Sequence, residues 1–453
     1  MPPDTSAPTP YLSSLIRDLR AAQRDLAAAS ADQRTAFLVN LRRRLVEREE
    51  ALLEANARDL ESALRHQLAD PLRRRLALSS GKLAALRDLL GRLASEPDPL
   101  MLPMTRTELD DGLVASRVQS PVGVVLAVFE SRPELTIELG ATALRTGNGI
   151  LLAGGAEAKA SNEAFASCLA EALEDAGLPG AAMARVAGRA EVDDLLGRER
   201  GIDLVIARGS RELVRGIEYS TRIPVLGHAE GICHLYLDAA ADPAMATHLA
   251  VDAKCDSPES SNAIETLLVH VAFLPKLVPV AAALKKRGVR LLADDRARRF
   301  WPAAAPAAEA DFGREWGEPT LSIAVVDDLG GALAHIERHG SGLAEAICTA
   351  DEEHAREFLR RVDAASVLWN ASTRFADGYC YGLGAGIATS TGRGPRRGPA
   401  GPAAFLTSRW LVEGRGQVAA DYGPDGGPAG GPGGGSGRGE GGRVFKHREL
   451  PLG

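Results

Sequence analysis

The sequence lacks several features that would assign it to a whole class of proteins. Lys and Arg total 53 against 60 Asp and Glu in 453 residues, a formal charge of -7. No basic excess is present to bind nucleic acid or an anionic membrane. There are five cysteines, an odd number scattered along the chain, which argues against a disulfide framework and a clustered zinc site and predicts reduced thiols without a metal.

Targeting and membrane signals are missing as well. The first ten residues, MPPDTSAPTP, contain no basic segment followed by an apolar run, so we expect no signal peptide. The longest apolar stretch, 263–284, is interrupted by Glu265, His270 and Lys276, which predicts no transmembrane helix. We therefore expect a cytoplasmic protein that acts on a small-molecule substrate, with neither nucleic acid nor membrane as a partner.

The composition is that of a globular chain: 45% hydrophobic and 25% charged residues can bury a sizeable core. The length predicts two or three domains. Residues 11–99 are predicted to be helical, because Phe37, Leu41 and Leu45 recur at helical spacing. Ser30 and Gln33 form a potential capping box just before them.

After residue 117 the pattern changes to short apolar runs that alternate with helical segments. Such alternation predicts a parallel β-sheet covered on both faces by helices. A first block contains apolar runs at 122–129, 149–153 and 203–207, with helical segments at 134–146, 157–175 and 211–219. A second block, which predicts a second α/β unit, has apolar runs at 234–238, 263–271, 289–293, 322–328 and 366–370.

Residues 423–442 are almost entirely Gly and Pro. Such a composition buries too little apolar surface to offset the entropy of ordering, which predicts a flexible linker. A structured composition resumes at 444–452 (VFKHRELPL). We therefore interpret the Gly-rich run as an insertion between two parts of one structural element.

Two predicted strand-to-helix turns are candidate phosphate sites. Gly154-Gly155 follows the run at 149–153, and Gly209-Ser210 follows the run at 203–207, with Ser210 as the expected N-cap. Free N–H groups and the helix dipole attract anions at such positions. Neither turn has the G-x-G-x-x-G pattern, so an ordinary capped turn stays open as the alternative.

Residues 252–269 (DAKCDSPESSNAIETLLV) change abruptly from polar to apolar. A junction between a loop and a regular element is a common place to expose a nucleophile. A simpler interpretation is that Ser260 or Ser261 caps the element that follows. The residues alone leave both interpretations open.

At these motifs the sequence resembles the gamma-glutamyl phosphate reductase family of the aldehyde dehydrogenase superfamily. The resemblance covers residues 11–452 and rests on six blocks in order. These are PVGVVLAVFESRPELT (121–136), ALRTGNGILL (143–152), GIDLVIARGS (201–210), IPVLGHAEGICHLYLD (223–238), DAKCDSPESSNAIETLLVH (252–270) and VDAASVLWNASTRFADG (362–378).

The resemblance implies an aldehyde dehydrogenase-like α/β fold with three parts. These are an NADP-binding domain at 11–232, interrupted by an arm segment at about 100–118, an α/β catalytic domain at 233–372, and a β oligomerisation arm. It further implies a disordered tail at 1–10, a return to the cofactor domain and arm at 373–422, the Gly-rich linker at 423–442 and the end of the arm at 443–453. The arm implies a homo-oligomer, a dimer or a tetramer.

The reaction that the resemblance implies is the NADPH-dependent reduction of L-glutamyl 5-phosphate to glutamate 5-semialdehyde in proline biosynthesis, through a cysteine thioester. The cofactor would be NADP(H), held by Gly154, Gly155, Arg208, Gly209 and Ser210. At the catalytic positions stand Ser261, Asn262 as a support for its loop, and His228 and Glu230 as acid–base candidates.

The family nucleophile position is occupied here by Ser261 instead of cysteine. A hydroxyl needs an adjacent base to attack, and an oxygen ester accepts hydride less readily than a thioester. Ala153, Ala156 and Gly386 stand where the family has Lys, Lys and an acid. Cys255, which lies six residues upstream of Ser261, is not expected to replace the missing thiol.

Three hypotheses remain open on this basis. The first is an NADP-dependent reductase whose competence the serine impairs, with the Ser261 backbone N–H in an oxyanion hole. The second is a non-catalytic or regulatory relative that keeps the fold. The third is a serine acyl-phosphate hydrolase in which Lys254 is the base.

Overall fold

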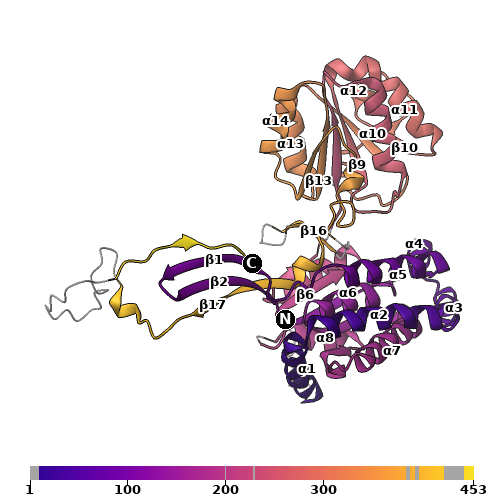
Figure 1. Ribbon diagram of the computed structural model, residues 1–453. Helices are drawn as coiled ribbons and strands as arrows, with labels where there is room; N and C mark the ends of the chain where they lie inside the picture. The colour runs from indigo at the N-terminus through magenta and orange to yellow at the C-terminus, as the bar shows by residue number, and fades with distance from the viewer. Residues whose placement is uncertain are drawn as a thin grey trace, which may run out of the picture.

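The computed structural model describes residues 10–198, 200–227, 230–383, 388–392, 397–422 and 443–452. Two α/β units lie one above the other, and a long β arm extends sideways from the lower unit (Figure 1). Both units contain a parallel sheet with helices, so the predicted α/β fold class is confirmed. His228, Gly386 and the Gly-rich segment 423–442 lie outside the described residues, as do residues 1–9 of the expected tail.

The chain begins with the predicted helices. They are α1 (Pro10–Ala28), α2 (Ala31–Glu47), α3 (Glu49–Arg65), α4 (Asp70–Leu76) and α5 (Ser80–Ser95). Ser30 caps α2: its hydroxyl accepts from the Gln33 N–H, and the Gln33 side chain accepts from the Ser30 N–H, completing the capping box.

The first sheet is parallel and has the strand order β5-β4-β3-β6-β7. The strands are β3 (Val124–Phe129), β4 (Gly149–Gly154), β5 (Met183–Arg185), β6 (Leu204–Arg208) and β7 (Val225–Leu226). Its helices are α6 (Leu135–Arg145), α7 (Lys159–Asp175), α8 (Arg189–Leu196) and α9 (Arg211–Ser220).

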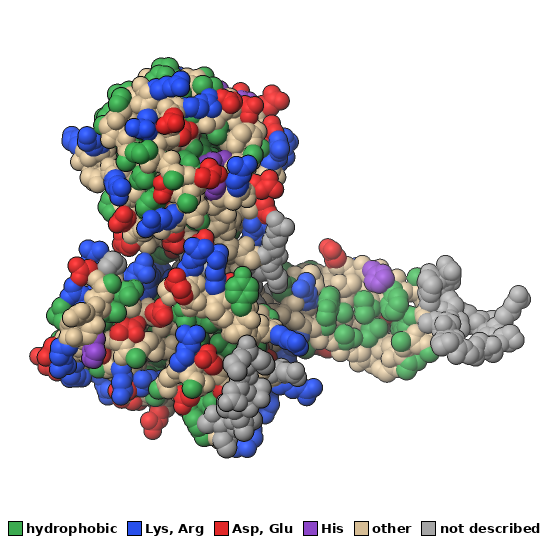
Figure 2. All heavy atoms as spheres, turned by 180° about the vertical axis from the view of Figure 1, so that it is seen from behind, with side chains coloured by type: hydrophobic (Ala, Val, Ile, Leu, Met, Phe, Trp, Pro, Cys, Tyr) green, Lys and Arg blue, Asp and Glu red, His purple; other side chains and the backbone are tan. Residues whose placement is uncertain are grey.

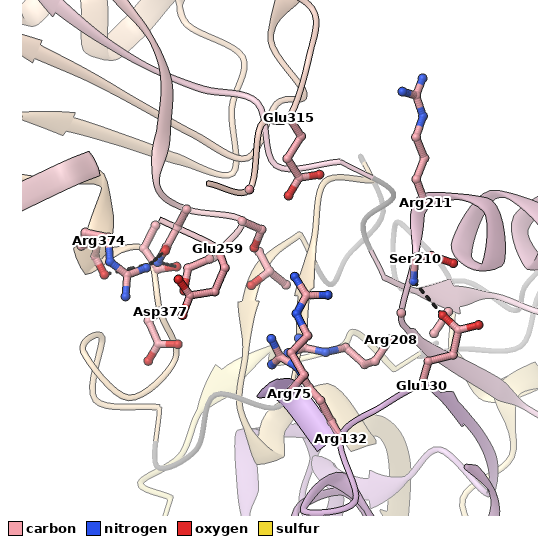
Figure 3. Close-up of a pocket in the computed structure, with 18 of the residues that line it drawn as sticks. Arg75, Glu130, Arg132, Arg208, Ser210, Arg211, Glu259, Glu315, Arg374 and Asp377 are labelled. Atoms are coloured by element: carbon pink, nitrogen blue, oxygen red, sulfur yellow. Dashed lines mark hydrogen bonds between the residues drawn. The ribbon is translucent and has the colours of Figure 1, made fainter. Parts of the chain in front are cut away.

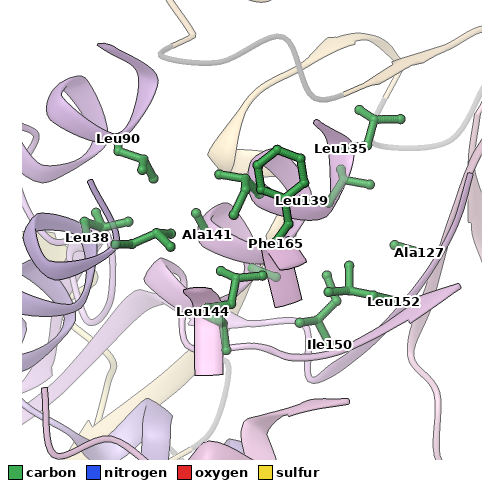
Figure 4. Packing of buried hydrophobic residues seen from close by; sticks show 14 of the residues in the cluster. Leu38, Leu90, Ala127, Leu135, Leu139, Ala141, Leu144, Ile150, Leu152 and Phe165 are labelled. Carbon is green, nitrogen blue, oxygen red and sulfur yellow. The ribbon is translucent and has the colours of Figure 1, made fainter. Parts of the chain in front are cut away.

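Two apolar clusters cover this sheet, one on each face. Figure 4 shows the larger, in which Leu144 and Phe165 from the helices pack against Ile150 and Leu152 of β4. The opposite face packs against α1, α8 and α9 through Leu12, Leu195 and Val214, among others. Burial on both faces explains why the strands read as nearly continuous apolar runs.

The second sheet is also parallel, with the order β11-β10-β12-β9-β8-β13-β14. Its strands are β8 (Cys233–Leu237), β9 (Ile264–His270), β10 (Arg290–Ala293), β11 (Ala305–Pro306), β12 (Thr320–Val326), β13 (Ala344–Cys348) and β14 (Ser366–Trp369). Its helices are α10 (Pro243–Cys255), α11 (Leu277–Lys286), α12 (Asp295–Arg298), α13 (Leu329–His339) and α14 (Glu352–Arg361).

The arm is an antiparallel sheet with the order β17-β2-β1-β18. Its strands are β1 (Pro103–Asp110), β2 (Leu113–Pro121), β17 (Leu406–Glu413) and β18 (Arg448–Glu449). Strands on both sides of the Gly-rich segment therefore belong to one sheet. A short ribbon of β15 (Ala388–Ser390) and β16 (Gly398–Ala400) precedes β17.

Among the described residues, no helix is long and apolar enough to cross a membrane. In the same part of the chain, no group of three His, Cys, Asp or Glu side chains is arranged to hold a metal ion.

Candidate active site

A cleft of about 490 Å³ lies between the two α/β units (Figure 3). The lower unit contributes the carboxyl ends of β3 and β6, and the upper unit contributes the loop before β9 and the segment after β14. Its polar lining residues include Arg75, Glu130, Arg132, Arg208, Ser210, Glu259, Ser260, Ser261, Asn262, Glu315, Arg374, Asp377 and Cys380. Ligands of parallel α/β folds bind at the carboxyl ends of the strands, which makes this cleft the candidate active site.

Ser261 lies in the loop between α10 and β9 and faces this cleft. The element that follows is a strand, so the interpretation of Ser260 or Ser261 as a helix cap is wrong. The Cys233 thiol donates a hydrogen bond to the Ser261 carbonyl oxygen at 3.3 Å. Gly231 passes so close that a Cβ there would lie 2.2 Å from the same oxygen. The carbonyl of Ser261 is thus held in place by Cys233 and by the close approach of Gly231.

The hydroxyl of Ser261 has no hydrogen-bond partner among the described residues, and neither has its backbone N–H. The N–H is therefore free to donate to a ligand. The Lys254 ammonium, the base required by the hydrolase hypothesis, does not reach this hydroxyl. It is fully buried and donates to the Glu265 carboxylate at 2.6 Å.

Asn262 is 8% exposed and is used to hold the loop. Its Nδ2 donates to the carbonyl oxygens of Arg374 and Ala376, at 3.3 and 3.2 Å. The Arg374 guanidinium donates to the Asn262 Oδ1 and, at 3.1 Å, to Asp256. The Asn262 amide therefore joins the Ser261 loop to the segment after β14, a supporting position.

The turn at Gly209-Ser210 has the predicted cap: the Ser210 hydroxyl accepts from the Leu213 N–H at 3.3 Å at the start of α9. The Ser210 N–H donates to the Glu130 carboxylate at 2.9 Å. A Cβ on Gly209 would lie 2.6 Å from that carboxylate. The helix start thus attracts an anion, as predicted, and in this structure the anion is a side chain.

A second hollow, of about 450 Å³, opens beside the cleft at the ends of β3 and β4. Gly154 and Gly155 line it, and a Cβ on either would collide, with Asn162 in one case and with Glu157 in the other. Glu130 lines both cavities and marks their junction. A glycine-lined hollow that joins a substrate cleft is a suitable site for a dinucleotide.

Of the two predicted acid–base candidates, Glu230 is described by the structure and does not line the cleft. The Glu230 carboxylate forms ion pairs with Arg211 and Arg215 of α9, at 2.5 and 2.6 Å. His228 lies outside the described residues.

The Arg208 guanidinium, which we predicted to hold cofactor phosphate, extends into the cleft and lies beside Arg75 and Arg132 (Figure 3). Burial and the positive charge of Arg132 lower the pKa of Arg208 to about 10.

Sequence reasoning missed several residues of the cleft. Arg75 and Arg132 were not singled out, although Arg132 lies inside a quoted block. Glu315 accepts a hydrogen bond from the Gly231 N–H, and burial raises its pKa.

Cys380 is an exposed thiol that lines the same cleft as Ser261, and desolvation and Asp377 raise its pKa. It lies two residues after the FADG block (375–378), and this proximity is the signal that could have drawn attention to it.

Residues 11–287 match the family model described as "Aldehyde dehydrogenase family". The fold, the two adjoining cavities and this match define the class: the chain belongs to the aldehyde dehydrogenase family.

Relatives that match nearly the whole chain narrow the assignment to one group within this family. The chain is 43% identical over 426 residues to the gamma-glutamyl phosphate reductase of Synechococcus sp. (strain JA-3-3Ab), which covers 93% of both proteins. It is 41% identical to that of Parasynechococcus marenigrum (strain WH8102), over 99% of this chain and all of the relative. The crystal structure of gamma-glutamyl phosphate reductase from Thermotoga maritima superposes with a TM-score of 0.86 at 32% identity, over 90% of this chain and 99% of that one. The chain is thus a member of the gamma-glutamyl phosphate reductase family, which confirms the resemblance.

Proposed function

We propose that the chain is an NADP(H)-dependent reductase that converts L-glutamyl 5-phosphate to L-glutamate 5-semialdehyde, a step of proline biosynthesis in the cytoplasm. In the net reaction the bond between the acyl carbon and the phosphoryl oxygen breaks. Hydride is added to that carbon, one proton is consumed and inorganic phosphate leaves. The observation that carries the proposal is the position of Ser261, which lines an arginine-rich cleft that adjoins a glycine-lined hollow at Glu130, in a chain that matches reductases over nearly its full length.

Ser261 has the role of the nucleophile position in this proposal. Attack by its Oγ on the acyl carbon would form an oxygen ester and release phosphate, and the hydroxyl proton would need an acceptor. Among the described residues no base contacts that hydroxyl, so we expect slow turnover. The free N–H of Ser261 is suited to hydrogen-bond the carbonyl oxygen as negative charge develops on it.

The hollow beside the cleft would hold the cofactor, which supplies hydride when bound. Ala153 and Ala156 provide no charge there, but Lys159 lines the same hollow and has no ion-pair partner among the described residues. We propose that Lys159 replaces the missing cations as the partner of the 2′-phosphate that distinguishes NADP from NAD.

Calorimetry with NADP+ and NAD+ tests this assignment. Lys159→Ala should weaken NADP+ binding by roughly tenfold and leave NAD+ binding unchanged. Arg189→Ala is the matched control, because Arg189 lines the same hollow but is already paired with Asp193 at 3.3 Å. Equal losses for both dinucleotides would contradict the assignment.

The arm supports a homo-oligomer as the working form. It projects away from both α/β units, and apolar side chains gather on its surface (Figure 2). Trp410, Val412 and Phe445 are among the exposed ones. Contiguous apolar surface of this kind marks an interaction site, and we propose a second copy of the chain as its partner.

A non-catalytic binding protein is the second candidate function, favoured by the unpartnered hydroxyl of Ser261. One assay separates the two. The purified chain is supplied with glutamate 5-semialdehyde, phosphate and NADP+, and NADPH formation is followed by absorbance. Phosphate-dependent NADPH formation supports the reductase. Its absence, with NADP+ still bound, supports the binding protein. Release of phosphate from glutamyl phosphate without NADPH would identify a hydrolase instead.

A further inference from the structure

Three arginines from distant parts of the chain meet in the cleft. Arg75 lies near the end of α4, Arg132 follows β3 and Arg208 is the last residue of β6. Their side chains converge in the middle of the cleft, whereas Arg211 extends away from them (Figure 3). The convergence is a product of the fold, because the three residues belong to no common motif.

None of the three guanidinium groups forms an ion pair or a hydrogen bond with another described residue. The Arg75 Nε is a buried atom without a partner. Burial and Arg132 lower the pKa of Arg75, as they do that of Arg208. Three cations held together against mutual repulsion are costly unless an anion joins them.

Two other arginines that line the cleft show the contrast. Arg211 is paired with Glu230 at 2.5 Å, and Arg374 with Asp256 at 3.1 Å. Arg211 and Arg374 are thus paired directly with carboxylates of the chain. The other three arginines have no direct ion pair, although Glu259 and Glu315 lie near Arg75, and Glu138 and Asp377 lie near Arg208.

We propose that Arg75, Arg132 and Arg208 form a dock for the phosphoryl group of the acyl phosphate. The proposal rests on the proposed function and names the part of the substrate that the cleft selects. Guanidinium groups match phosphate oxygens in a bidentate geometry. A dianion bound here would place the adjoining acyl carbon in the cleft with Ser261. When the carbon–oxygen bond breaks, its electron pair leaves with the phosphate, and the three cations stabilise that charge.

The helix start at Ser210 is a different anion site, because its N–H group is bonded to Glu130. We therefore assign the pyrophosphate of the cofactor to the glycine-lined hollow at Gly154 and Gly155, and the phosphoryl group of the substrate to the three arginines. Arg208, which the sequence predicted to bind cofactor phosphate, is thus assigned to the phosphoryl group of the substrate.

Inorganic phosphate is the probe, because it is the leaving group and binds without turnover. Calorimetry on the full chain compares wild type with Arg132→Ala and Arg208→Ala. Each variant should weaken phosphate binding by roughly tenfold to a hundredfold, as expected for a charge-assisted hydrogen bond. Arg211→Ala is the matched control and should bind phosphate like wild type. Arg132→Lys keeps the positive charge but loses the bidentate geometry of the guanidinium, so its affinity for phosphate should lie between those of wild type and Arg132→Ala. This conservative variant also keeps the test valid if Arg132→Ala does not fold.

The outcomes separate this inference from the proposed function. Phosphate binding that depends on the arginines, in a chain without NADP-dependent turnover, upholds the dock and rejects the reductase. Turnover in which the KM for phosphate is the same in wild type and in Arg208→Ala rejects the dock and upholds the reductase. A loss of NADP+ affinity in Arg208→Ala with unchanged phosphate affinity would return Arg208 to the cofactor and overturn the inference.

Discussion

Replacing Ser261 by cysteine tests the central chemical consequence of the sequence. The exchange substitutes sulfur for one oxygen in a side chain that lines the cleft. The contacts with Cys233 and Gly231 are made by the carbonyl oxygen, Cα and Cβ of Ser261, which the exchange leaves in place. We therefore expect the free energy of unfolding to change by no more than about 0.5 kcal/mol.

The expected gain in rate follows from the missing base. A positioned general base contributes roughly 10²- to 10⁴-fold, and the Ser261 hydroxyl contacts none among the described residues. A thiol needs no such base, since a few per cent is already ionised at pH 7. Ser261→Cys should therefore raise kcat/KM by about 10²-fold or more. The gain should increase with pH up to the thiol pKa, which is near 8.5 when unperturbed.

The assay is NADPH formation from glutamate 5-semialdehyde, phosphate and NADP+. Ser260→Cys is the matched control, because Ser260 lines the same cleft one residue earlier, and it should produce no gain. Cys380→Ser tests the thiol that the cleft already contains and should leave the wild-type rate unchanged. If Cys380→Ser abolishes wild-type turnover, or if Ser261→Cys brings no gain although NADP+ and phosphate still bind, the reasoning is wrong.

Three further predictions concern the support of the site and the assembly. Lys254→Met should destabilise the fold by about 3–5 kcal/mol, because it leaves Glu265 buried without its partner; urea unfolding measures the loss, and the double variant with Glu265→Gln should recover part of it. Gly231→Ala should lower turnover while the second sheet stays folded, since the added Cβ displaces the Ser261 carbonyl; circular dichroism alongside the assay distinguishes this from global unfolding. Trp410→Arg should shift the protein to a smaller species in light scattering, and an unchanged mass would exclude this face of the arm as the contact.

Much of the scaffold could be predicted because its signals are local. The runs at 122–129 and 203–207 are rich in Val and Ile and became strands of a parallel sheet. The strand at Ala344–Cys348 was not predicted, because it has only five residues, two of them alanine, and contains Glu345, which is fully buried beside His234. Tertiary burial overrides the weak propensity of such a segment.

The site was predictable only in part. A motif could place Ser261 and Asn262 in one loop, and a capping residue could be recognised in Ser210. No local pattern could show that Arg75, Arg132 and Arg208 converge, because each lies in a different element. The burial of Lys254 could not be predicted from the sequence either, because a lysine on a helix is ordinarily exposed. The pairing of this lysine with Glu265 depends on how α10 packs against β9.

The pairing of the arm constrains how the chain is made. The Arg106 side chain donates to the Pro451 carbonyl across 345 residues of sequence, and Arg448–Glu449 pairs with Thr107 and Glu108. While the chain emerges from the ribosome, the β2 edge of the hairpin stays unpaired until β17 (Leu406–Glu413) has been made, and the β1 edge stays unpaired until β18 (Arg448–Glu449) follows. Unpaired strand edges recruit other strands. We therefore expect the newly made polypeptide to be most prone to aggregation during this interval. Pairing of β18 with β1 covers the last open edge of the hairpin.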